Sequence, residues 1–98
     1  MQALRQGDVM LIPASETVDG AKLTHLTLAE GEVTGHRHRI TQGEAELYEY
    51  KGTLYLKVLS LTALLTHEEH QPIAIPQGDW MVRIQREYEP EGWRYVAD

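Results

Sequence analysis

Hydrophobic residues recur at every second position over several segments of the chain, which is the period of a β-strand with one buried face. The pattern is clearest in residues 53–61 and 80–88. The apolar face of the first segment consists of Leu54, Leu56 and Val58. The apolar face of the second consists of Trp80, Val82, Ile84 and Tyr88. Both segments are therefore predicted to be strands that share a core.

Shorter apolar segments bounded by glycine, proline or acidic turns predict further strands. They occupy residues 8–13, 22–31, 36–40, 45–50, 72–76 and 93–98. The run at 61–66 fits either a strand or a short helix, because length and periodicity do not separate the two. Turns are expected at residues 51–52 and 89–92.

No segment shows a helical period over more than two turns, and no internal repeat is visible. A chain of 98 residues is long enough for one core. The predicted fold class is therefore all-β, with residues 1–98 forming a single small β-barrel or β-sandwich of about seven to nine short strands.

The composition limits the kinds of binding site and partner that the chain can have. The formal net charge of −6 opposes nonspecific binding to nucleic acid, because the overall field repels phosphates. The absence of cysteine excludes disulfides and thiolate ligands, so a transition-metal site would have to use histidine and carboxylate. No stretch approaches the ~20 apolar residues that cross a membrane. No membrane association is expected, and the cytoplasm is the expected compartment.

Histidine and arginine alternate in the stretch GEVTGHRHRI, residues 31–40. In an extended strand, His36 and His38 point to the side of the apolar Ile40, and Arg37 and Arg39 point to the other side. Two imidazoles spaced in this way can offer two nitrogen ligands to one metal ion.

A second pair lies in the stretch HEEH, where His67 and His70 flank Glu68 and Glu69. This spacing places both imidazoles on one side of a helical turn or tight loop. If the two pairs converge, the candidate metal ligands are His36, His38, His67 and His70. The candidate ions are Zn, Mn, Fe, Co and Ni. Glu44 is a further carboxylate for such a site, and the candidate catalytic residues are His36, His38, Glu68 and Glu69.

Other interpretations stay open. The first pair could simply hydrogen-bond to Glu44 or Glu46, and HEEH could be a solvated loop. A metal-free site could use the histidines as acid and base for a nucleotide or other phosphate, as in a phosphodiesterase. Its anionic ligand, phosphate or carboxylate, would be held by Arg37, Arg39 and Arg86. The chain could also be a noncatalytic module. Its exposed strand edges favour a homo-oligomer.

Two resemblances add to this picture. His36, His38 and Glu44, followed by Pro76 and Gly78, resemble the two motifs of the cupin superfamily, which implies a jelly-roll-like barrel with a metal site. No histidine follows Gly78, so the cupin metal triad does not carry over whole.

The order GDV, GEVTGHRHR, HEEH and QREY is similar to that in a set of small bacterial and phage proteins without a known function. This resemblance covers most of the chain. It implies a complete stand-alone all-β domain and no particular activity.

Overall fold

The computed structural model describes residues 2–15, 19–31 and 33–85. These residues form eight strands in one sheet. The strands are β1 (Leu4–Gln6), β2 (Val9–Pro13), β3 (Ala21–Lys22), β4 (Thr27–Glu30), β5 (Arg37–Gln42), β6 (Ala45–Tyr50), β7 (Thr53–His67) and β8 (His70–Ile84). The predicted all-β class is confirmed. Among the described residues, no helix is long and apolar enough to cross a membrane.

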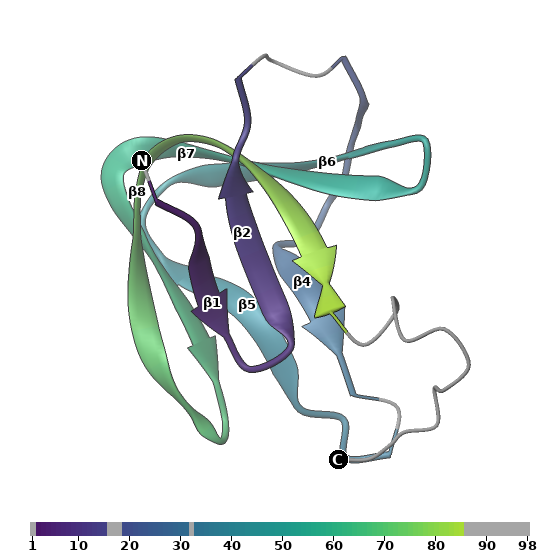
Figure 1. Ribbon diagram of the computed structural model, residues 1–98, viewed down its shortest axis with the longest axis vertical. Helices are drawn as coiled ribbons and strands as arrows, with labels where there is room; N and C mark the ends of the chain where they lie inside the picture. Colours follow the sequence, from purple (N-terminus) through teal and green to yellow (C-terminus); the bar gives the residue numbers. More distant parts are fainter. Residues whose placement is uncertain (1, 16–18, 32, 86–98) are drawn as a thin grey trace.

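The sheet is antiparallel and curls into a half-barrel around two long central strands, β7 and β8 (Figure 1). β7 pairs with β8 along one edge, and along its other edge with β6 in its first half and β5 in its second half. The second half of β8 pairs with β2, which in turn pairs with β1. β3 pairs with β6, and β4 pairs with β5. The antiparallel pair β7–β8 is therefore the centre of the half-barrel.

The β7–β8 pair bends at an irregularity in β7, where the register with β8 shifts between Val58 and Thr62. The Ser60 hydroxyl donates to the Thr62 carbonyl at 2.7 Å and accepts the Glu44 N–H at 2.8 Å. The Leu59 N–H donates to the Glu44 carbonyl at 2.8 Å. Because these bonds satisfy the backbone where ladder bonds are missing, the strand bends without leaving the sheet.

This bend explains the ambiguous run at 61–66, which is the second half of β7 and not a helix. In the same way, the predicted strand at 72–76 and residues 80–84 of the predicted strand at 80–88 belong to one continuous strand, β8. The predicted inward face is confirmed, since Trp80 and Val82 are buried. The expectations for Arg86, Tyr88 and residues 89–98 lie outside the described residues.

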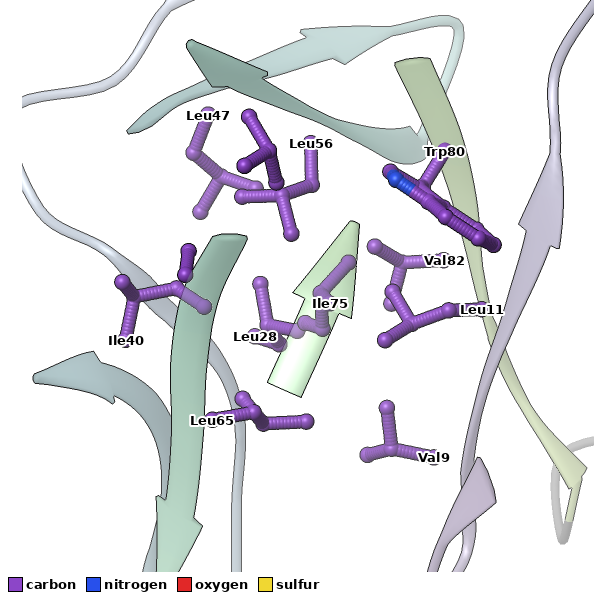
Figure 2. Packing of buried hydrophobic residues seen from close by; sticks show 12 residues of the cluster. Val9, Leu11, Leu28, Ile40, Leu47, Leu56, Leu65, Ile75, Trp80 and Val82 are labelled. Carbon is purple, nitrogen blue, oxygen red and sulfur yellow. The ribbon is translucent and has the colours of Figure 1, made fainter. Parts of the chain in front are cut away.

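The concave side of the half-barrel holds the core (Figure 2). Its buried hydrophobic residues come from six strands and are Val9, Leu11, Leu28, Ile40, Leu47, Leu56, Val58, Ala63, Leu65, Ile75, Trp80 and Val82. Trp80 is the largest fully buried side chain among them, and its indole N–H donates to the Pro76 carbonyl at 3.0 Å. Burial of the ring therefore leaves no indole N–H unpaired.

Candidate metal centre

The two histidine pairs meet at one end of the half-barrel. His36 precedes β5 and His38 is the second residue of that strand, whereas His67 ends β7 and His70 begins β8. Since β5 and β7 are antiparallel, with Arg39 opposite Thr66, the start of β5 lies beside the end of β7. The start of β5 and the β7–β8 turn lie at the lower end of Figure 1. Convergence of the two pairs thus follows from strand pairing.

His67 occupies the centre of the cluster. Its ring centroid lies 4.2 Å from that of His38, 4.7 Å from that of His70 and 5.6 Å from that of His36. The rings of His38 and His70 are 5.8 Å apart. All four imidazoles from the sequence analysis are therefore neighbours.

Among the described residues, His36, His67 and Glu68 form a group of possible metal ligands, with donor atoms that all lie within 4.8 Å of one another. One carboxylate oxygen of Glu68 accepts the backbone N–H of Arg37 at 2.9 Å, which ties the β7–β8 turn to the start of β5. This hydrogen bond is the main cause that lowers the pKa of Glu68. The carboxylate is therefore ionised at neutral pH and suited to bind a cation.

His36 carries an unsatisfied atom. Its Nδ1 is buried and, within the part of the chain that the structure describes, has no hydrogen-bond partner. The carboxylate oxygen Oε2 of Glu69 is 3.6 Å away, which is within ion-pair range but too long for a hydrogen bond. A buried polar atom without a partner costs about 1–3 kcal/mol. A cation at this position would remove that cost.

The surroundings of His67 favour its neutral form. Burial lowers its pKa, and the positive charges of His70 and His36, when protonated, lower it further. Its Nδ1 accepts the Glu69 N–H at 3.0 Å, so the proton of the neutral ring is on Nε2. A metal ion bound at either nitrogen must displace this backbone hydrogen bond, because binding at Nε2 moves the proton to Nδ1. Metal binding would therefore rearrange the Glu68–Glu69 turn.

Sequence reasoning missed two residues of the β1–β2 hairpin. The buried Gln6 side chain accepts a hydrogen bond at 2.9 Å from His38 Nδ1, and its amide NH₂ donates to the carbonyls of Leu65 and Gln71, each at 2.9 Å. Gly7 lies under the ring of His70, so that a Cβ at this position would be 2.6 Å from His70 Nε2. Only the curl of the sheet brings residues so distant in sequence together, and no local pattern indicates it.

A pocket of about 220 Å³ opens beside the cluster. It is lined by Gly7, Asp8, Val9, Ala29, Glu30, Gly31, Thr34, His36, His38, His67, Glu69, His70 and Ile84. Histidines and carboxylates thus supply most of its polar groups. This chemistry suits a bound cation better than a bound anion.

The arginines of β5 lie apart from the histidines. Arg37 and Arg39 are exposed, His38 is buried, and neither arginine lines the pocket. The Arg37 guanidinium lies 3.5 Å from the Glu30 carboxylate. The predicted alternation along this strand is confirmed. Arg86, the third arginine expected to bind an anion, lies outside the described residues.

Four other residues from the predicted motifs lie away from the histidine cluster. Glu44 follows β5, roughly 15–20 Å along the extended chain from His38. Glu46 bonds to Lys22 and Tyr48. The cupin-like pair, Pro76 and Gly78, lies at the bend of β8, opposite Thr62 and Val58 of β7. In the described residues, the histidine cluster is therefore built without the second cupin-like motif.

Comparison with known proteins gives a family but no activity. No curated protein matches the chain, and no solved structure matches it. A family model described as "Domain of unknown function (DUF8820)" matches residues 5–85, which include the eight described strands except for Leu4, the first residue of β1, and the histidine cluster. The sequence prediction of a small domain family without a known function is confirmed: the chain belongs to the DUF8820 family.

Proposed function

We propose that this protein binds one divalent transition-metal ion at the histidine cluster, with His36, His67 and Glu68 as ligands. The observation that carries the proposal is the approach of their donor atoms to within 4.8 Å of one another, from two segments about thirty residues apart in sequence. The unsatisfied Nδ1 of His36 and the lowered pKa values of His67 and Glu68 support it, since a metal requires deprotonated ligands.

Two imidazoles and one carboxylate suit Zn²⁺, Mn²⁺, Fe²⁺, Co²⁺ and Ni²⁺, and a chain without cysteine offers no thiolate to select among them. Such a three-ligand set would leave coordination positions for water or a substrate. With Glu68 as a ligand, the role of general base passes to Glu69, which lines the pocket beside the cluster. A metal-dependent reaction on a small molecule is the activity that this arrangement supports best.

The test is titration of the untagged protein with Zn²⁺ and Co²⁺, followed by calorimetry and elemental analysis. We expect one bound ion per chain at micromolar metal. The variants His36→Ala and His67→Ala should each bind at least about 10-fold more weakly, because each loses a ligand. The Glu69 amide resonance should shift on binding, because the hydrogen bond to His67 is displaced.

His25→Ala is the matched control, because His25 is exposed and lies outside the cluster; its Nδ1 accepts the N–H of Thr27. This variant should bind metal as the wild type does. Absence of binding at micromolar metal would refute the proposal, as would equal loss of binding in His25→Ala and His67→Ala.

A further inference from the structure

Three hydrogen bonds close the turn between β4 and β5, at whose end lies the proposed ligand His36. The Gly31 N–H donates to the His36 carbonyl at 2.9 Å, and the Gly35 N–H donates to the Gly31 carbonyl at 3.0 Å. The Thr34 hydroxyl oxygen accepts the His36 N–H at 3.1 Å. Both backbone polar groups of His36 are therefore bonded within the turn.

The bond to Thr34 is the one of the three that uses a side chain. Gly31 leaves room for the hydroxyl, because a Cβ at that position would lie 2.9 Å from Thr34 Oγ1. Thr34 also lines the pocket beside the cluster, as His36 does. The hydroxyl thus lies beside both ends of the turn, next to the proposed metal centre.

The backbone that this bond fixes serves two of the three proposed ligands. The imidazole of His36 approaches His67 and Glu68. The next N–H along the chain, that of Arg37, donates to the Glu68 carboxylate at 2.9 Å. A rotation of the backbone at His36 would therefore move one ligand and the donor that holds another. Ligands must be held within about 0.5 Å of the productive geometry, so such a movement would weaken metal binding.

We infer that Thr34 is a positioning residue that keeps the β4–β5 turn closed, and so presets His36 and the contact between Arg37 and Glu68 for the metal ion. The inference rests on the proposed metal binding. Thr34 acts through the backbone of its neighbours and not as a ligand. Without its hydroxyl, the turn would have to be ordered when the metal binds, and this ordering would reduce the affinity.

The test compares Thr34→Val, which keeps the shape of the side chain but loses the acceptor, with Thr34→Ser, which keeps the hydroxyl. In the metal-free protein, the His36 amide proton should lose protection against exchange with solvent in Thr34→Val. Calorimetric titration should show Zn²⁺ binding about 3- to 10-fold weaker in this variant, the effect of about one hydrogen bond. Thr34→Ser should restore the protection and most of the affinity.

A double-mutant cycle shows whether Thr34 acts through His36. In a His36→Ala background the imidazole is gone, so Thr34→Val should lose most of its effect on Zn²⁺ affinity. Thr62→Val is the matched control, because it removes a hydroxyl at an exposed position opposite Pro76, away from the cluster. This control should match the wild type in Zn²⁺ affinity and in exchange of the His36 amide.

The outcomes separate this inference from the proposed function. Unchanged Zn²⁺ affinity in Thr34→Val overturns the inference, and so does a full effect of that substitution in the His36→Ala background. Failure of Thr34→Ser to recover affinity also overturns it, because the hydroxyl would then not be the group responsible. In each of these cases the wild type still binds metal, so the proposed function stands. If the wild type binds no metal, the proposed function fails and this inference fails with it.

Discussion

At the scale of single residues, the cluster is a set of imidazoles with different surroundings. His38 is buried against Gln6, and His36 has an unsatisfied Nδ1. His67 lies between the other rings and has a lowered pKa because burial opposes its charged form. Because folding opposes protonation of this central ring, the protonation state of the site is linked to the free energy of unfolding.

The lowered pKa of His67 predicts a loss of stability in mild acid. Between its folded pKa and the unfolded value of about 6.5, the unfolded chain binds more protons than the native chain, so the free energy of unfolding rises with pH. In EDTA, the protein should thus unfold at a lower urea concentration at pH 5 than at pH 7.5. His67→Gln should reduce this difference.

His25→Gln serves as the control for that measurement, since His25 is exposed. It should keep the full pH dependence of the wild type. A pH dependence that is unchanged in His67→Gln would show that burial of this ring does not couple to unfolding.

At the scale of elements, the site depends on two tight turns that meet at one end of the sheet. The β1–β2 hairpin turns at Gly7 and Asp8, with Gln6 paired to Val9, and the β7–β8 hairpin turns at Glu68 and Glu69, with His67 paired to His70. Gly7 has a φ of 59°, a conformation that other residues adopt only at a cost. The missing side chain also leaves room for the His70 ring.

Gly7→Ala should therefore destabilise the protein in two ways. The left-handed backbone costs about 1–2 kcal/mol for a residue with a Cβ. Contact of that Cβ with His70 Nε2 at 2.6 Å adds overpacking, which typically costs about 1–3 kcal/mol. The check is urea unfolding at pH 7.5.

Gly52→Ala is the matched control. Gly52 also has a positive φ, of 80°, and a Cβ there would meet nothing within 4 Å. It should show only the backbone cost. In a His70→Ala background, the excess cost of Gly7→Ala over Gly52→Ala should disappear. An excess that survives the loss of the His70 ring would contradict the predicted contact.

At the scale of the whole molecule, β7 and β8 serve both the core and the site. The first half of β7 and the second half of β8 contribute Leu56 and Trp80 to the core. The ends of the two strands at their shared turn carry His67 and His70. Because the two strands pair on both sides of the irregularity between Val58 and Thr62, damage to the core should reach the metal site through the same strands.

Trp80→Ala tests this coupling. Removal of a fully buried indole should cost about 3–5 kcal/mol, a large share of the 5–15 kcal/mol that typically stabilises a domain. We expect a sharply lowered Tm and weaker Zn²⁺ binding. Leu61→Ala, at a residue that is 83% exposed, should change neither quantity measurably. Full metal affinity in a destabilised but folded Trp80→Ala would show that the site is independent of the core.

The sequence by itself determined the all-β class, the inward faces of its strands and the two histidine pairs, because each of these depends on residues close together in the chain. The period of two that buries Leu56 and Val58 also separates His38 from Arg37 and Arg39. These features are local, and local geometry is fixed by the pleat of a strand.

Only the tertiary structure decided which histidines meet and what supports them. The meeting of His38 with His67 requires β5 to pair with the second half of β7, which depends on the bend at Ser60. The bonds of Gln6 and the fit of Gly7 against His70 require the sheet to curl until β1 reaches the β7–β8 hairpin. Curvature arises from twist and from irregular register summed over many strands, and no short stretch of sequence contains it.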